Sequence, residues 1–418
     1  MAAAHEGESV KPRIYLDNSA TTRIDDRVLE AMLPYLRERF GNAGSIHSFG
    51  QEARAAVEDA RRAVAELLGA DTREIVFTSG GTESDNAALW GVWRSGHRTG
   101  NHIITSKIEH PAVLSTCKAL ESAGAEVTCL PVDSSGRVDP ERVAAAIRDT
   151  TILISIMHAN NETGIIQPIK EIGSLARERG ILLHTDAVQS LGKIPVQVQE
   201  LGADLVSVSG HKIHAPKGVG ALWVRGGVKL VPFLTGGAHE RRRRAGTENV
   251  PAVVGFGVAA HLALERLPEM GTRVAALRDR LESRIKSGVA GVHTNGDVEN
   301  RLPNLANLAF ERVEGEAAVI ALDLAGVAVS TGSACSSGSL DPSHVLVGMG
   351  LRSEIVQGSL RFSLCYHNTV EEIDGTVEIL SEVVGRLRGL ARRGQDRTTS
   401  DLRILASDVR RASEAPDA

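Results

Sequence analysis

A lysine at position 212 comes directly after a short apolar run that predicts a buried strand. Ser209 and His211 beside it can form hydrogen bonds, and a desolvated amine in such surroundings is nucleophilic and can form a Schiff base. A second predicted strand ends in a carboxylate, Asp186, with Gln189 three residues further on. A carboxylate is the partner that the ring nitrogen of pyridoxal phosphate (PLP) requires. The two motifs together predict a lysine that carries PLP, with Gln189 either on the phenolic oxygen of the ring or in a solvated loop.

A glycine-rich stretch at 78–86 adds a candidate anion site. It follows a predicted strand and opens a predicted helix, so that backbone N–H groups converge near Gly81 and the hydroxyl of Thr82. An anion is stabilised at such a helix N-terminus, and the phosphate of PLP would suit it. Glycine-rich turns are common, however, and an ordinary tight turn explains the stretch at least as well when it is taken alone.

Two further side chains are candidates for contact with a cofactor or a substrate. His110 begins a predicted helix and is a candidate to stack on the ring or to shuttle protons, although a histidine at a helix start is often structural. Arg361 lies in a strand-like apolar segment, where its anionic partner is either a substrate carboxylate or a structural ion-pair partner. His211 and His214 lack the further ligands of a closed metal site, so no intrinsic metal site is predicted.

Cys335 stands in a run of small residues, 330–339, that neither a helix nor a strand favours. We expect such a segment to be exposed and mobile. A thiol on a flexible arm can attack a substrate inside a site and then swing outward with the group it has removed. The other cysteines, Cys117, Cys129 and Cys365, are each expected to be small buried apolar residues.

Size and composition restrict the class of protein. The chain has 418 residues, 42% of them hydrophobic, which is enough for a sizeable core divided over two domains. A net charge of -5 gives no global reason to expect a nucleic acid or a membrane as partner. Four irregularly spaced cysteines argue against a disulfide framework and for a reducing, cytoplasmic compartment. We find no uncharged apolar run of the ~20 residues that a membrane helix needs, because the best candidate, 317–329, is interrupted by Asp323.

Short β-branched runs alternate with amphipathic stretches from about residue 74 to residue 224, which predicts a mostly parallel sheet covered by helices. Ligands on such sheets bind beyond the carboxyl ends of the strands, where the candidate residues lie. The predicted strands are 75–77, 102–105, 126–130, 152–156, 181–183, 205–208, 305–310 and 359–363.

We therefore expect an α/β protein with two domains and two flexible ends. A long helix at 252–287, broken at Pro268 and Gly271, leads from the first domain to the second, and a last helix covers 370–390. The expected divisions are a leader at 1–14, a large domain at 15–262, a small C-terminal domain at 263–391 with the cysteine run, and a tail at 392–418.

Taken together, the motifs resemble those of the cysteine desulfurases of the NifS/IscS type, within the class V aminotransferase-like PLP enzymes. The resemblance runs from about Tyr15 to Val384, with the motifs in the order of that family. It implies the PLP-dependent transferase fold, which is similar to aspartate aminotransferase. The matching segments are 15–22, 78–86, 109–113, 159–164, 184–189, 209–220, 244–249 and 333–346.

The resemblance implies that Lys212 holds PLP covalently. Asp186 would pair with the ring nitrogen, Gln189 would meet the phenolic oxygen, and His110 would stack on the ring. Residues of two motifs would hold the phosphate, namely Gly81, Thr82, Ser209 and His211.

The remaining implied roles concern the substrate and the partners. Thr247 resembles the threonine of the family that reaches the phosphate from the neighbouring subunit, which implies a homodimer. Asn161 and Arg361 match the positions that bind the carboxylate of L-cysteine. Cys335 matches the nucleophile that takes the sulfur, which leaves L-alanine and an enzyme persulfide. With an iron-sulfur scaffold protein, Cys335 would also be a transient cluster ligand.

Several alternatives stay open at this point. The sulfur acceptor is either an iron-sulfur scaffold or a thiolation protein, and a selenocysteine lyase or a non-catalytic sulfur-assembly scaffold would use the same fold. Intact Lys212, Asp186 and Cys335 argue against the non-catalytic scaffold. Two segments depart from the family's pattern, namely 365–367, where a glycine is usual, and the arginine run at 241–244.

Overall fold

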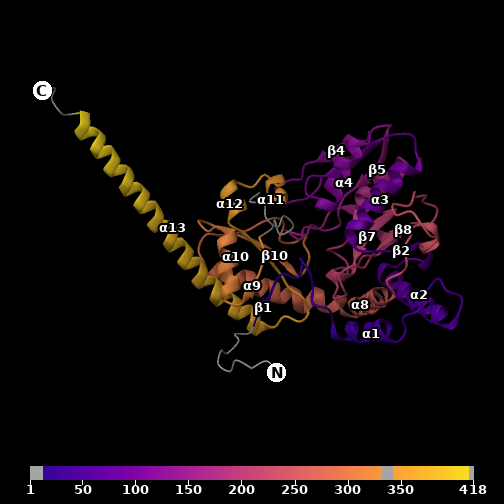
Figure 1. Cartoon of the computed structure of the whole chain (residues 1–418). Coiled ribbons are helices and arrows are strands. Elements are labelled where there is room, and N and C mark those ends of the chain that lie inside the picture. Colours follow the sequence, from indigo (N-terminus) through magenta and orange to yellow (C-terminus); the bar gives the residue numbers. More distant parts are fainter. Residues whose placement is uncertain (1–12, 332–341, 414–418) are drawn as a thin grey trace, which may run out of the picture.

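The computed structural model describes residues 13–331 and 342–413, and the side chains of 13–331 and 342–391. The chain forms two lobes (Figure 1). We call the lobe built on a seven-stranded sheet the large domain, and the lobe built on a three-stranded sheet the small domain. Each lobe has its own buried apolar residues, so the two cores are separate.

The large sheet has the strand order β2-β8-β7-β6-β5-β3-β4. Only β8 runs opposite to the others, so the predicted mostly parallel sheet is confirmed. The sequence analysis missed β8 because no α-helix lies between β7 and β8, so the alternation of strands and helices that guided the prediction is absent there. The strands are β2 (Ile75–Thr78), β3 (His102–Ser106), β4 (Glu126–Leu130), β5 (Thr151–Ser155), β6 (Leu182–Asp186), β7 (Leu205–Ser209) and β8 (Gly220–Val224).

Successive residues of these strands face opposite sides of the sheet, as strand geometry requires. Ile103 packs in one core cluster and Ile104 in the other, and Leu182 and Leu183 divide in the same way. Both faces are therefore buried under helices. One face is covered by α3 (Gly81–Ser95) and α4 (Pro111–Ser122), and the other by α1 (Asp26–Arg37), α2 (Ser48–Leu68), α6 (Ile169–Glu178) and α8 (Val250–Glu269). Two short helices complete this domain, α5 (Pro140–Ala146) and α7 (Val198–Leu201).

The edge strand β4 corrects one expectation. Cys129 was expected to be buried, like Cys117 and Cys365, but it is exposed. The reason is its position, because an edge strand has no neighbour on one side.

The long helical segment that joins the domains is broken where the sequence predicted. α8 is followed by a π-helical turn, Met270–Val274, and then by α9 (Ala275–Gly288). The whole of Val250–Gly288 is long and apolar enough to cross a membrane, contrary to the sequence analysis, but 56% of its most apolar window is buried inside the protein. α8 lies against α2 so closely that a Cβ at Gly257 would be 2.5 Å from the Cα of Ala60. It is therefore a core helix of the large domain.

The small domain contains the predicted strands 305–310 and 359–363, as β10 (Leu305–Phe310) and β12 (Ser359–Ser363). They form an antiparallel sheet with β9 (Val292–Thr294). The N-terminal strand β1 (Ile14–Tyr15) pairs with β11 (Val327–Ala328), and Leu16 packs in the small core, so the chain enters the large domain slightly later than residue 15. The helices are α10 (Gly315–Leu324), α11 (His344–Gly348), α12 (Ser353–Gln357) and α13 (Val370–Ser413).

The last helix is longer than expected. We predicted a helix at 370–390 and a flexible tail from 392, but α13 is helical to Ser413 and extends away from the small domain (Figure 1). Residues 392–413 contain no proline, and six of them are arginine, a residue that favours helix. The many polar and charged residues of this segment led the sequence analysis to expect a flexible tail.

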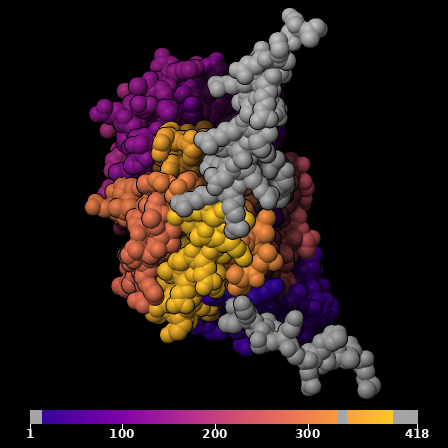
Figure 2. Space-filling model, turned by 90° about the vertical axis from the view of Figure 1, so that its left-hand side faces the viewer, coloured from indigo at the N-terminus to yellow at the C-terminus, as the bar shows by residue number. Residues whose placement is uncertain are grey.

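The helix α11 packs directly on the large domain. Val345, Leu346 and Met349 form a buried cluster with Ile108 and Met157. Figure 2 shows this part of the small domain lying against the large domain, with α13 in yellow beside it. The contact brings the chain that follows the cysteine run close to residues next to His110.

Candidate active site

A cavity of about 290 Å³ lies at the carboxyl ends of β6 and β7, next to β12 of the small domain. Parallel sheets commonly bind ligands at this edge. Ten of the residues predicted from the sequence line it, namely Gly81, Thr82, His110, Asn161, Asp186, Gln189, Ser209, His211, Lys212 and Arg361.

Lys212 lies in the short turn Gly210–Lys212, directly after β7. Its amine donates hydrogen bonds to the carbonyl oxygens of Ser19 and Ala20, each at 2.6 Å. Gln189 donates to the same carbonyl of Ser19 at 3.0 Å and is buried, so it is not a solvated loop residue. The lysine is partly buried in the cavity wall, as a Schiff-base lysine must be.

A second lysine, which the sequence analysis missed, supports the backbone of the first. The buried amine of Lys193 donates a hydrogen bond to the carbonyl oxygen of Lys212. Burial, together with the charge of Lys212, lowers the pKa of Lys193 to about 7. No spacing or motif in the sequence marks this lysine, because its partner is a backbone atom 19 residues away.

We expect Lys193 to make stability depend on pH. In the unfolded chain this amine keeps its proton up to a pKa near 10.5, so the unfolded state binds more protons than the folded state between about pH 7 and 10.5. Stability then rises with pH in that window, by at most about 1.4 kcal/mol per pH unit. Urea unfolding of the holoenzyme at pH 7 and 9 should show this rise in the wild type and not in Lys193→Met. The same rise in both proteins would contradict a buried amine.

Asp186 ends β6 inside the cavity. Burial raises its pKa to about 6, while the backbone N–H of Val188, at 2.9 Å, and the charge of Lys212 act in the opposite direction. A second carboxylate, Asp85, lines the same cavity, and burial and the charge of Asp186 raise its pKa. The sequence analysis gave Asp85 no role, although it lies four residues after Gly81 on the same face of α3.

The glycine-rich stretch forms a turn that leads into α3. The helix begins at Gly81, where a Cβ would lie only 2.7 Å from the Val188 side chain. Ser209 faces this turn from the end of β7, and its hydroxyl oxygen is buried without a hydrogen-bond partner within the described structure. Free N–H groups at a helix N-terminus and an unpaired hydroxyl fit a phosphate.

His110 is the N-cap of α4, where its Nδ1 accepts a hydrogen bond from the backbone N–H of Ala112 at 3.1 Å. Burial lowers its pKa to about 4, with contributions from Lys212 and His344. The imidazole is therefore neutral at pH 7. It is both a structural cap and a wall of the cavity, so the two interpretations of this histidine are compatible.

Arg361 reaches the cavity from β12 and is 2% exposed. Its guanidinium donates to a carboxylate oxygen of Asp17 at 2.8 Å and to the backbone carbonyl of Asn161 at 3.0 Å. The structural ion pair considered from the sequence therefore exists. The Nε of Arg361 is nevertheless buried with no hydrogen-bond partner in the described part of the chain, and the side chain lines the cavity.

Two residues that the sequence predicted for the site are not among the described residues that line this cavity. Thr247 is exposed and borders a separate cavity of about 200 Å³, together with Thr78, Ser79 and Arg244. Cys335 lies outside the described residues. Within residues 13–331 and 342–391, no group of three or more His, Cys, Asp or Glu side chains could hold a metal ion.

The polar atoms of the cavity fit PLP. Lys212 would hold its aldehyde, Asp186 its ring nitrogen, and the turn at Gly81 with Ser209 its phosphate. The unpaired hydroxyl of Ser209 is the observation that decides this fit, because a buried polar group without a partner is costly unless a ligand satisfies it.

Comparison with known proteins agrees with this interpretation. Residues 14–375 match the model of the family "Aminotransferase class-V". The chain is 52% identical to "Cysteine desulfurase IscS" of Methanosarcina thermophila, over 92% of this chain and 96% of that protein. It is 48% identical to "Cysteine desulfurase NifS" of Azotobacter vinelandii, over 90% of this chain and 94% of that protein. A solved structure described as "NIFS-LIKE PROTEIN" superposes with a TM-score of 0.84 at 41% identity, covering 89% of this chain and 99% of that one.

The chain therefore belongs to the class V aminotransferase family of PLP-dependent enzymes. Within that family it belongs to the cysteine desulfurases of the NifS/IscS type, and its cofactor is PLP. The resemblance and the fold class predicted from the sequence are confirmed.

Proposed function

We propose that the chain takes the sulfur atom from L-cysteine, releases L-alanine, and carries the sulfur as a persulfide of Cys335 to an acceptor protein. The observation that carries this proposal is the position of Arg361. A buried guanidinium with an unpaired Nε lines the cavity that also contains Lys212. Such a group binds the α-carboxylate of an amino acid and orients its amino group toward the cofactor.

The residues of the chain then move the proton and the sulfur. PLP, when bound, supplies an electron sink for the carbanion at Cα. The amine of Lys212 takes the Cα proton, and neutral His110 accepts or donates a hydrogen bond without adding charge. The Cys335 thiolate attacks the substrate sulfur, so that an S–S bond forms and the Cβ–S bond breaks. The electron pair of that bond goes to the carbon skeleton, which is protonated to give the methyl group of alanine.

A homodimer is the second part of the proposal, and the position of Thr247 supports it. Thr247 is exposed and borders a different cavity from Lys212, so a second subunit is needed to bring it to a phosphate in the Lys212 cavity. Four exposed apolar side chains near this segment would suit a subunit interface. They are Leu36 (57% exposed), Phe40 (73%), Ile46 (91%) and Phe49 (52%).

The apolar side chains and Thr247 belong to neighbouring segments. A Cβ at Gly44 would lie 3.9 Å from the ring of His239, and His239 holds Glu248, next to Thr247, at 3.0 Å. One contact surface with a second copy would therefore cover the apolar side chains and also bring Thr247 to the partner's site.

The acceptor and the compartment complete the proposal. The acceptor is an iron-sulfur scaffold or a thiolation protein that takes sulfur from Cys335, and the reaction takes place in the cytoplasm. All three cysteines in the described part of the chain are free thiols, which supports a reducing compartment.

The proposed reaction predicts equal amounts of two products. Purified holoenzyme given L-cysteine, without a reductant, should release one alanine for each sulfur atom found on the protein as persulfide in the first turnover. Cysteamine, which lacks the carboxylate, should give at least roughly a hundredfold less persulfide, because Arg361 has nothing to bind. Alanine and persulfide are measured by amino-acid analysis and by cyanolysis. Turnover of selenocysteine with no persulfide from L-cysteine would instead identify a selenocysteine lyase.

A further inference from the structure

The arginine run at 241–244 has no place in the reaction described so far, and its backbone is unusual. Glu240, Arg241 and Arg242 have φ values of 45°, 56° and 65°, in the left-handed region. This conformation costs about 1–2 kcal/mol for each residue that is not glycine. Three such residues in succession need support from the surrounding structure, and the segment 239–248 receives it at two points.

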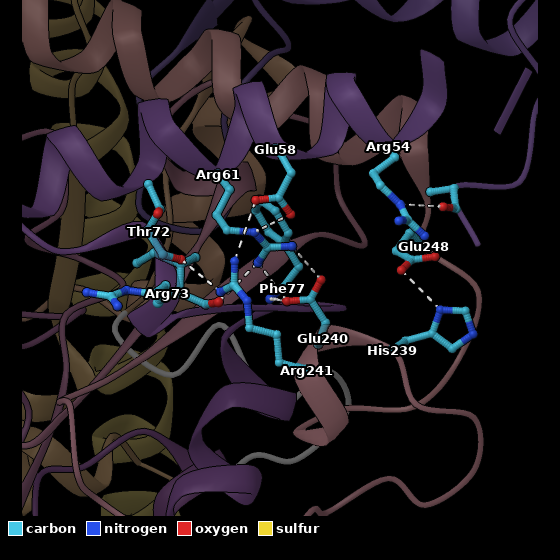
Figure 3. Close-up of polar contacts among 12 residues, drawn as sticks. Arg54, Glu58, Arg61, Thr72, Arg73, Phe77, His239, Glu240, Arg241 and Glu248 are labelled. Carbon is cyan, nitrogen blue, oxygen red and sulfur yellow. Dashed lines mark hydrogen bonds and ion pairs between the residues drawn. The ribbon is translucent and has the colours of Figure 1, made fainter. Parts of the chain in front are cut away.

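The first point of support is a buried ion pair with α2 (Figure 3). The guanidinium of Arg61 donates to both carboxylate oxygens of Glu240, each at 2.8 Å, and both side chains are 4% exposed. Glu240 also accepts the backbone N–H of Phe77 at 2.9 Å, and Arg61 lies over the Phe77 ring. The beginning of the segment is thus fixed to β2, the strand that leads into the phosphate turn.

The second point of support is an ion pair with α3. Arg244 donates to the two carboxylate oxygens of Glu83 at 2.8 and 3.1 Å. Glu83 also accepts the backbone N–H of Ser79 at 2.8 Å. Burial alone would raise the pKa of Glu83, but the hydrogen bonds from Arg244 and Ser79 hold it below its usual value, so the carboxylate is ionised at pH 7. The two supports therefore lie on either side of the turn, at Phe77 and at Glu83.

Two further arginines of the run, Arg241 and Arg243, also contact this chain, whereas Arg242 is exposed. Arg241 donates to the carbonyl of Thr72 at 3.2 Å and lies 3.6 Å from Glu58, as Figure 3 shows. Arg243 donates to the carbonyls of Arg73 and Ile75. Because these guanidinium groups hold backbone atoms around the start of β2, a structural task explains the run better than an open basic surface for nucleic acid.

We propose that the segment 239–248 positions the phosphate turn, with Arg244 and Glu83 as its positioning pair and Arg61 and Glu240 as its anchor. The inference deepens the proposed function, on which it rests for the phosphate ligand of the turn. Glu83 directly follows Thr82, which lines the Lys212 cavity, so a shift of Arg244 moves the groups that bind the phosphate. Binding of the ring and the aldehyde of PLP does not depend on the Arg244–Glu83 pair.

The test compares PLP with pyridoxal, which has the same ring and aldehyde but no phosphate. Holoenzyme variants Glu83→Gln and Arg244→Met are treated with hydroxylamine, which forms an oxime with the cofactor aldehyde and frees the amine of Lys212. After dialysis they are titrated with each compound, following the absorption of the bound cofactor. PLP should bind about tenfold more weakly in each variant, and pyridoxal should bind within about twofold of the wild type. The double variant should lose no more PLP affinity than either single variant, because both residues act through the same ion pair.

Two further variants keep the test decisive. Asp374→Asn breaks an exposed two-point pair with Arg280, at 2.7 Å in the small domain, and should change neither affinity. Arg244→Lys keeps the charge and should lose less PLP affinity than Arg244→Met, even if the latter accumulates poorly. Equal losses for PLP and pyridoxal, or no loss for either, would overturn the inference. If the wild type formed no alanine from L-cysteine, the proposed function would be refuted, but the comparison of PLP and pyridoxal affinities would still test the role of the Arg244–Glu83 pair.

Discussion

Replacing Cys335 by alanine is expected to leave PLP bound and to reduce alanine release from L-cysteine by at least roughly a thousandfold. The reason is that no other cysteine in the described residues can take its place. Burial raises the pKa of Cys117 to about 12 and that of Cys365 to about 11, so both are protonated thiols. The measurement is single-turnover alanine release, with the cofactor absorption of each protein recorded beforehand.

The exposed thiol provides the matched control for this experiment. Cys129 lies on the edge strand β4 and does not line the Lys212 cavity, and partial desolvation and nearby acidic groups raise its pKa. Cys129→Ser should therefore turn over like the wild type. If Cys335→Ala kept full activity, or if Cys365→Ala lost it while Cys335→Ala did not, the assignment of the nucleophile would be wrong.

Replacing Lys212 by alanine is expected to remove the covalent link to PLP and at least roughly ten-thousandfold of the turnover. Lys193 cannot substitute for it, because its amine is hydrogen-bonded to the backbone of residue 212 and does not line the cavity that contains Asp186. Borohydride reduction followed by mass spectrometry should place the cofactor on Lys212 in the wild type and nowhere in the variant. The exposed Lys217, changed to alanine, is the control and should behave like the wild type.

The same variant can show whether two subunits share each site. Lys212→Ala and Thr247→Val subunits are mixed, and the hybrid is isolated by means of two different tags. If Thr247 acts on the partner's site, one of the two sites of the hybrid combines a native Lys212 with a native Thr247. That site then regains its PLP affinity, and the hybrid regains about half of the wild-type turnover. If Thr247 acts within its own chain, the hybrid binds PLP no better than the Thr247→Val parent, which would contradict the shared site.

Much of the fold could be predicted because it rests on local patterns. The six predicted strands of the large domain and the two of the small domain are present, with every end within three residues of its expected position. A strand whose residues are buried on both faces of the sheet, or point alternately into two cores, is marked in the sequence by a short apolar run. The extension of α13 was missed because polar and charged residues dominate beyond residue 392, and helix propensity alone is a weak signal in such a segment.

The site was predictable where its chemistry rests on residues at strand ends. Asp186 and Lys212 follow apolar runs, and the topology brings them into one cavity. Asp85 and Lys193 escaped notice for a different reason. Each acts through a partner distant in sequence, so only the folded chain shows that Lys193 supports residue 212 or that Asp85 shares a cavity with Asp186.

The placement of Arg361 has a thermodynamic consequence for the whole molecule. It belongs to the sheet of the small domain, whereas Lys212 belongs to that of the large one, and their cores are separate. In the proposed function, an amino acid bound to Arg361 and to the cofactor on Lys212 would join these two domains, whose unfolding is otherwise coupled only through their common boundary. Binding of the substrate would then increase the cooperativity of unfolding, since a ligand that binds only when both domains are folded favours the state in which neither domain has unfolded.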